Sequence, residues 1–229
     1  MRSSFPGKRF RKWLSTAFCL ATFVAGHASM NGPDASDASL TASKVFAEAP
    51  LEVLDMLRPS TRLDMLDYYT QADSIFVATN ALGGESRLLE VAPDYLKAEI
   101  TPVSTLEIKI LKTGNKETVM TLFTTGGEGQ ARDTEVRFFD SALRPLDGGK
   151  LLKAPVLTDF FNLKGSDVSE EDLREKVPYA AVEYTTGPGD EPLTAALTTL
   201  SVISKEDRDL LTPLMVKTKS APWKNKYIF

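Results

Sequence analysis

Residues 96–124 read LKAEITPVSTLEIKILKTGNKETVMTLFT, and this stretch decides the fold. Apolar and charged residues alternate in its first half, as in residues 106–110 (LEIKI), which is the period of a β-strand with one apolar and one charged face. Residues 118–124 (TVMTLFT) are apolar on both faces and predict a central strand. Gly114-Asn115 between these segments is typical of a tight hairpin turn. We therefore expect an antiparallel sheet that is covered on one side only.

Two helices are expected before this sheet. Leucines recur at every third residue in residues 50–58 (PLEVLDMLR), a pattern typical of a helix opened by proline. Pro59 interrupts that helix, and Ser60 or Thr61 would cap a second one. The inner face of the second helix would carry Leu63, Leu66 and Tyr69, and its outer face Arg62, Asp64 and Asp67.

Short helices and strands are expected in the C-terminal part of the chain. A capping box at residues 169–172 (SEED) predicts a helix start, and a further short helix is expected over residues 205–211. Residues 179–185 and 193–202 flank the loop 187–190 (GPGD) and predict a hairpin. We find no long linker before this part, so it is expected to share one core with the sheet.

The predicted fold class is α+β. An N-terminal helix pair would pack on a largely antiparallel sheet, and a second, smaller helix-plus-strand unit would share its core. The folded domain is expected to span residues 44–229, with a subdivision near residue 150 as the alternative.

The first 28 residues have the three-part layout of a secretory signal peptide. The basic opening contains Arg2, Lys8, Arg9, Arg11 and Lys12. An apolar run from Trp13 to Val24 follows, shorter than the roughly 20 residues of a membrane span, and then small residues up to Ala28. An amphipathic first helix of the folded domain is the alternative. We expect cleavage after Ala28, a disordered spacer at residues 29–43, and a periplasmic or cell-surface location for a protein secreted across the inner membrane.

The expected mature chain lacks cysteine and histidine, because Cys19 and His27 are the only residues of these types in the chain. Disulfides, Cys/His zinc sites, histidine bases and the Ser-His-Asp triad are thereby excluded. Loss of the basic signal makes the mature chain more acidic than the whole chain, whose formal net charge is −4. This charge argues against nucleic acid or an anionic membrane as a partner. No metal or other cofactor is expected.

Asp64 and Asp67 are the candidate catalytic residues, because carboxylates are the remaining general acids and bases. They lie three residues apart on the predicted second helix and could form the acid and base pair of a glycan hydrolase. A solvated helix face explains the same pair, and we favour it. Arg62 nearby, together with Trp223 and Tyr227 on one face of the last strand, are the candidate ligand-binding residues. The two aromatic rings could stack on a sugar, although such residues are more often part of a core.

The run from Pro50 to Tyr69 carries an Arg-Leu-Asp-Met-hydrophobic-Asp-aromatic signature over residues 62–68. It resembles the opening of the domain of unknown function 3256 family, which comprises secreted proteins of Bacteroidales. Further matches are an Asn-x-x-Gly-Gly turn at residues 80–84 and the segment 136–140 (VRFFD). The resemblance implies export and a single-domain architecture. The family has no assigned activity, so it carries over no catalytic or binding residue.

We therefore expect an exported protein of unknown function that acts as a non-enzymatic binding module for a protein or glycan partner. The alternative is a carboxylate-dependent hydrolase acting on glycans. A deep pocket that holds both Asp64 and Asp67 would favour the enzyme, whereas a shallow surface with these aspartates in water would favour the binding module.

Overall fold

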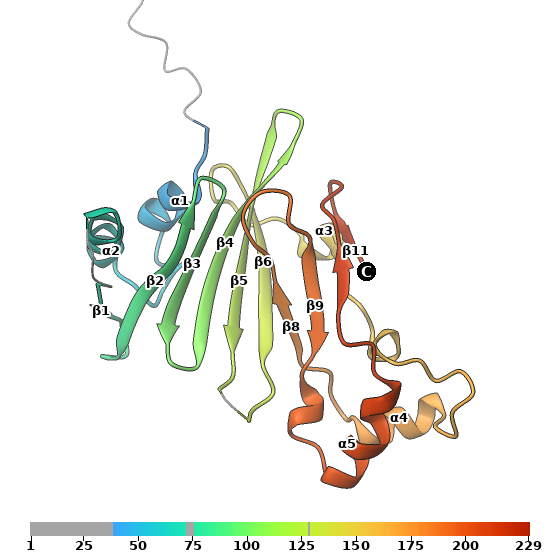
Figure 1. Cartoon of the computed structure of the whole chain (residues 1–229). Coiled ribbons are helices and arrows are strands. Elements are labelled where there is room, and N and C mark those ends of the chain that lie inside the picture. The colour runs from blue at the N-terminus through green and yellow to red at the C-terminus, as the bar shows by residue number, and fades with distance from the viewer. Residues whose placement is uncertain (1–38, 72–75, 128) are drawn as a thin grey trace, which may run out of the picture. The chain divides into compact units, whose positions relative to one another are not determined.

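A six-stranded antiparallel sheet is the largest element of the computed structural model, which describes residues 39–71, 76–127 and 129–229 (Figure 1). Each strand pairs with the next one in the sequence, so the order is β1-β2-β3-β4-β5-β6. The strands are β1 (Ala78–Thr79), β2 (Glu85–Ala92), β3 (Tyr95–Thr101), β4 (Ser104–Thr113), β5 (Lys116–Thr125) and β6 (Asp133–Asp140). The predicted hairpin turn joins β4 to β5, where Thr113 pairs with Lys116.

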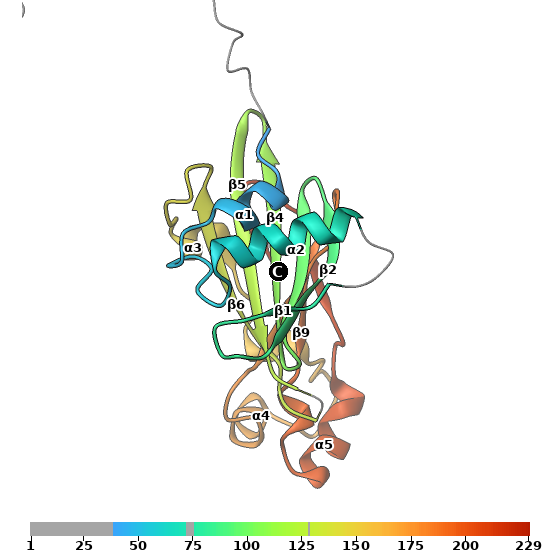
Figure 2. The ribbon, with the colours of Figure 1, turned by 90° about the vertical axis from the view of Figure 1, so that its left-hand side faces the viewer.

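Two helices, α1 (Ala42–Glu48) and α2 (Pro59–Gln71), run across the strands on one face of the sheet (Figure 2). Thr41 caps α1 by accepting a hydrogen bond from the Lys44 N–H at 3.2 Å. The core between the helices and the sheet contains Val45, Phe46, Met65, Leu96, Ile108 and Val119. The N-terminal helix pair is thus present.

The bounds of this helix pair differ from those predicted. Helix α1 begins at Ala42, so the last residues of the predicted spacer are helical, while residues 51–57, which were expected to be helical, form turns. Helix α2 begins at Pro59 itself, because a proline at the first helical position loses no intrahelical hydrogen bond. Residues 29–38 of the predicted spacer and the predicted signal peptide lie outside the described residues.

The C-terminal part of the chain packs on the other face of the sheet, where Figure 1 shows β8 and β9 on the side away from α1 and α2. Its strands form a three-stranded sheet in the order β10-β9-β8 and a parallel pair of β11 with β7. The strands are β7 (Leu152–Lys153), β8 (Val182–Thr185), β9 (Leu193–Leu197), β10 (Lys219–Ala221) and β11 (Tyr227–Ile228). The helices are α3 (Gly148–Leu151), α4 (Glu170–Lys176) and α5 (Lys205–Leu211), with short 3-10 turns at Leu157–Phe160, Thr199–Ser201 and Thr212–Leu214.

The sheet is therefore covered on both faces, and the expectation of one solvated face was wrong. Along β5, Val119 belongs to the core under the helices, whereas Met120 and Leu122 belong to the core under the C-terminal part. Because successive side chains of a strand point to opposite faces, these two cores lie on opposite sides of the sheet. The predicted α+β class, with a smaller second unit packed on the sheet, is confirmed.

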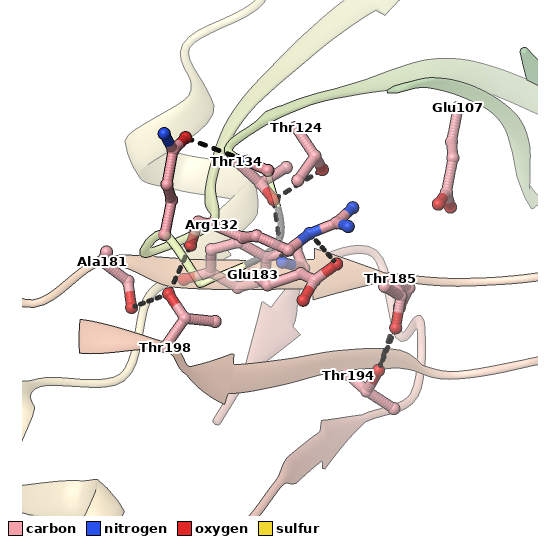
Figure 3. A network of polar contacts seen from close by, with 12 residues as sticks. Glu107, Thr124, Arg132, Thr134, Ala181, Glu183, Thr185, Thr194 and Thr198 are labelled. Carbon is pink, nitrogen blue, oxygen red and sulfur yellow. Dashed lines mark hydrogen bonds and ion pairs between the residues drawn. The ribbon is translucent and has the colours of Figure 1, made fainter. Parts of the chain in front are cut away.

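Polar contacts fasten β8 to the sheet at one end, as Figure 3 shows. The Val182 N–H donates to the Asp133 side chain and the Tyr184 N–H to the Thr134 hydroxyl, both at 3.0 Å. The Thr198 hydroxyl donates to the Arg132 carbonyl at 2.6 Å. These bonds satisfy donors on an outer strand that would otherwise be buried unpaired.

Gly126, which follows β5, lies where a side chain would clash with the backbone. Gly126 has φ +126°, and a Cβ on it would lie 2.5 Å from the Ala131 carbonyl oxygen. Gly114 in the β4–β5 hairpin also has positive φ (+56°), but a Cβ there would meet no atom within 4 Å. We expect Gly126→Ala to lower the free energy of unfolding by about 2 kcal/mol and Gly114→Ala by about 1 kcal/mol. Calorimetric unfolding of both variants tests this, and equal losses would contradict it.

Candidate functional site

A buried lysine links the sheet to the loop between β8 and β9. Lys109 on β4 is 3% exposed, and its ammonium group donates to Asp94 Oδ2 at 2.7 Å, to the Gly187 carbonyl at 2.7 Å and to the Gly189 carbonyl at 2.5 Å. An ammonium group has three N–H donors, so all are used. The Gly189 N–H also donates to Asp94 at 3.1 Å. Lys109 and Asp94 therefore hold this loop on the face of the sheet.

A second ion pair lies beside this one. Glu107, the preceding residue on the same face of β4, is 2% exposed and lies 3.0 Å from the Lys97 ammonium group. Its carboxylate also accepts a hydrogen bond from the Thr186 N–H at 3.3 Å. Glu107 and Lys109 of β4 are thus buried under the loop and paired with the partly buried Lys97 and Asp94, which is why this charged face of the sheet is not solvated.

The ionisation of Asp94 follows from its contacts. Partial burial acts to raise its pKa, but the Lys109 hydrogen bond, the Gly189 N–H and the positive charge of Lys109 together hold the pKa below its ordinary value. Asp94 therefore stays a carboxylate throughout the neutral range.

A cavity of about 310 Å³ opens between this loop, β4 and the C-terminal residues. We call it the Trp223 cleft. Its polar and aromatic lining consists of Asp94, Lys109, Lys112, Asp190, Glu191, Trp223 and Tyr227. Asp190 and Glu191 are exposed on the loop that Lys109 holds. A concave site with aromatic walls and a few fixed polar groups is typical of small-ligand binding.

Both aromatic residues singled out in the sequence lie in this cleft. The indole N–H of Trp223 donates to Thr113 Oγ1 at 3.0 Å, and the ring centroids of Trp223 and Tyr227 are 5.1 Å apart with a tilt of 56°. Trp223 is half-buried. Burial raises the pKa of Tyr227, so this phenol stays neutral. Trp223 is thus held at both its polar edge and its ring.

Arg62, the third candidate ligand-binding residue, lies in the core instead. Its side chain is 0% exposed and donates to the carbonyl groups of Phe46 at 2.7 Å and Ala49 at 2.5 Å, where α1 ends. Leu63, predicted to face inward, is 51% exposed. Tyr69 is exposed as well, so hydrophobicity misplaces Arg62, Leu63 and Tyr69. Leu66 packs on the core, and Asp64 and Asp67 are exposed, as predicted. Arg62 lies inside because its guanidinium group satisfies helix-end carbonyls and its long apolar stem packs in the core. Desolvation lowers the pKa of Arg62.

Asp64 and Asp67 are both exposed on α2, and neither lines the Trp223 cleft. Asp64 is the sixth residue of the helix, beyond the first turn, so it gains little from the positive helix end.

We expect Asp64→Asn and Asp67→Asn each to change the free energy of unfolding by less than about 0.5 kcal/mol. Thermal unfolding tests this. Loss of a measured hydrolytic activity in either variant would contradict the interpretation of this pair as part of a solvated helix face.

Two further cavities, of about 160 and 460 Å³, lie on either side of Arg137 on β6 and share Val53. Their lining is mainly apolar. The guanidinium group of Arg137 lies 3.6 Å from Glu135 and 5.8 Å from the centroid of the Phe139 ring, so it already has partners. We therefore place the candidate site at the Trp223 cleft.

Sequence reasoning missed Asp94, Lys109, Asp190 and Glu191. Lys109 was assigned to a solvated strand face, and the loop at residues 187–190 was identified only as a turn. The bonds that join them span 78 and 80 residues, a separation over which one sequence carries no pairing signal.

In the part of the chain that the structure describes, no group of three His, Cys, Asp or Glu residues is placed to hold a metal ion. Among the same residues, no helix has the length and apolar character of a membrane span.

A family model described as "Protein of unknown function (DUF3256)" matches residues 35–228. Among solved structures, a domain of an uncharacterized protein from Porphyromonas gingivalis W83 is similar, with a TM-score of 0.70 and 14% sequence identity. The match covers 81% of this chain and 96% of that domain. At this identity the likeness shows a shared fold alone. No curated protein matches the chain.

Proposed function

The chain belongs to the DUF3256 family of proteins of unknown function, and we propose that it is an exported, non-enzymatic binding protein whose ligand enters the Trp223 cleft. The observation that carries this proposal is the pair of buried Lys109 with partly buried Asp94, which fixes the loop bearing Asp190 and Glu191 at the cavity that Trp223 also lines. A cleft whose walls are fixed before binding loses little conformational entropy when a ligand enters.

The ionisation of Asp94 and Tyr227 favours binding over acid–base catalysis by these two groups. The Lys109 ammonium group is saturated with acceptors, and the pKa of Asp94 lies below its ordinary value. The pKa of the Tyr227 phenol is raised. General acids and bases work best with pKa values near the working pH, whereas these two groups have been moved away from it. No observation favours the glycan hydrolase, because Asp64 and Asp67 lie in water on a helix face.

Export is supported by the basic, apolar and small-residue segments of residues 1–28. Fractionation of cells that express the whole chain, followed by N-terminal sequencing, tests this part. We expect a periplasmic or surface product that begins at Ser29. A cytoplasmic product that retains residues 1–28 would contradict export.

Binding at the cleft is tested by capture from a Bacteroidales envelope extract with the tagged, processed protein. The Asp190→Asn/Glu191→Gln variant should lose what the wild type captures, because its two cleft carboxylates become neutral. The matched control is Glu171→Gln/Glu175→Gln on α4, which removes the same charge from exposed positions outside the cleft. Capture that is equal for all three proteins would contradict a role for the cleft.

A further inference from the structure

We propose that the Trp223 cleft selects an ammonium group, carried by a lysine side chain or an amino sugar, over a neutral or anionic ligand. This inference rests on the proposed function, since it names the chemistry of the ligand at the same cleft. It is carried by the charges, the hydrogen-bonding capacity and the aromatic surface of the residues that line the cavity.

Negative charges without an ion-pair partner outnumber positive ones among the residues that line the cleft. Asp94 is balanced by Lys109 at 2.7 Å. The Lys112 ammonium group lies 3.4 Å from the carboxylate of Glu117 on β5 and donates to the Ser39 hydroxyl at 3.2 Å. Among the described residues, Asp190 and Glu191 form no ion pair. Two exposed residues that line the cavity thus carry carboxylates without an ion pair, and their charge attracts a cation and repels an anion.

Most of the hydrogen-bond donors that line the cleft already have partners. Three donors that line it are already engaged: the Lys109 ammonium group by three acceptors, the Trp223 indole by Thr113, and the Gly189 N–H by Asp94. The carboxylates of Asp190 and Glu191 remain as acceptors, and the Tyr227 hydroxyl can both donate and accept. A neutral sugar hydroxyl both donates and accepts, whereas an ammonium group only donates. A cleft that offers acceptors therefore matches the ammonium group better.

The aromatic surface of the cleft also favours a cation. Because the indole N–H is turned to Thr113, the electropositive edge of Trp223 is occupied by the protein. Tryptophan is the side chain that attracts cations most strongly through its ring face. Tyr227 is 1% exposed, with its ring centroid 5.1 Å from that of Trp223, so it packs against the indole while the half-buried Trp223 supplies the aromatic surface. Carboxylates and an indole ring both attract an ammonium group.

Calorimetric titration of the processed protein at about pH 6 tests the inference with two matched pairs of probes. One pair is Nα-acetyl-lysine methylamide and its Nε-acetylated form, and the other is glucosamine and N-acetylglucosamine. We expect at least one cation to bind about tenfold more tightly than its neutral partner, as one charge-assisted hydrogen bond implies. The pair with the larger ratio identifies the source of the ammonium group.

The Asp190→Asn/Glu191→Gln variant should abolish this preference, and the Glu171→Gln/Glu175→Gln control should keep it. Neutral probes that bind as tightly as their cations would overturn the inference while the cleft remains a binding site. If no probe binds but capture from the envelope extract still depends on Asp190 and Glu191, the inference alone is overturned. If that capture is also independent of them, the proposed function is overturned as well.

Discussion

Arg62→Met should lower the free energy of unfolding by about 3–5 kcal/mol, although methionine suits a buried helix position. The guanidinium group is fully buried and supplies two donors to the carbonyls of Phe46 and Ala49. Without it, two buried acceptors lose their partners, at about 1–3 kcal/mol each, and a space is left in the core. At about 2–4 °C per kcal/mol for a chain of this size, the melting temperature should fall by roughly 10 °C.

Arg58→Met is the matched control, because Arg58 directly precedes α2 and is exposed. The same chemical change there should alter the free energy of unfolding by less than about 0.5 kcal/mol. Thermal unfolding followed by circular dichroism compares the two variants. If both melt at the wild-type temperature, Arg62 does not support the junction between α1 and α2.

Lys109→Met is expected to have an effect of similar size, about 3–5 kcal/mol, because it breaks a buried ion pair from one side. It leaves the Asp94 carboxylate and the carbonyls of Gly187 and Gly189 without their shared donor. The loop that carries Asp190 and Glu191 then loses its attachment to the sheet. Ligand binding should be lost together with stability.

A double-mutant cycle separates the ion pair from the rest of this effect. Asp94→Asn combined with Lys109→Met should cost less than the sum of the two single variants, since neither charge is then left without its partner. Chemical denaturation measures the four free energies. Additive losses would show that Lys109 and Asp94 do not act as a pair.

The Lys109–Asp94 pair also predicts an acid dependence. The pKa of Asp94 is lowered in the folded protein, so the unfolded chain binds the proton more readily. Its stabilising contribution is therefore complete above the ordinary aspartate pKa of about 3.9 and is lost as the pH falls through the lower folded value. The difference in free energy of unfolding between wild type and Asp94→Asn should shrink below about pH 4. A difference that stays constant from pH 6 to pH 3 would contradict this.

Local sequence signals predict the local elements of this fold well. The capping box at Ser169 and Asp172, the cap at Ser204 and the β8–β9 hairpin are all present, because each depends on residues a few positions apart. The alternation in residues 106–110 correctly predicts a strand. It does not distinguish a solvated charged face from a buried one whose charges are paired, so Glu107 and Lys109 were misplaced.

For the candidate site as well, the sequence indicates single residues but not the contacts between distant parts of the chain. The prediction that Trp223 and Tyr227 share one face of the last strand was wrong, because β11 begins at Tyr227 and Trp223 precedes it outside any strand. The structure nevertheless brings both residues to one cavity. Arg62 was placed in water because charged residues are rarely fully buried, whereas its partners are backbone carbonyls, which no residue type reveals. The acidic side of the cleft depends on a loop whose position is fixed by contacts with β4, far away in the sequence.

The indole N–H resonance of Trp223 tests most directly whether the cleft binds a ligand. The chain contains two tryptophans, Trp13 and Trp223, so the processed protein should give one indole signal in a ¹⁵N correlation spectrum, and Trp223→Phe would assign it. On titration with the cation that binds in calorimetry, this signal should shift in the wild type and stay in place in Asp190→Asn/Glu191→Gln. Binding that saturates in calorimetry while the Trp223 signal does not move would place the ligand elsewhere and contradict the account.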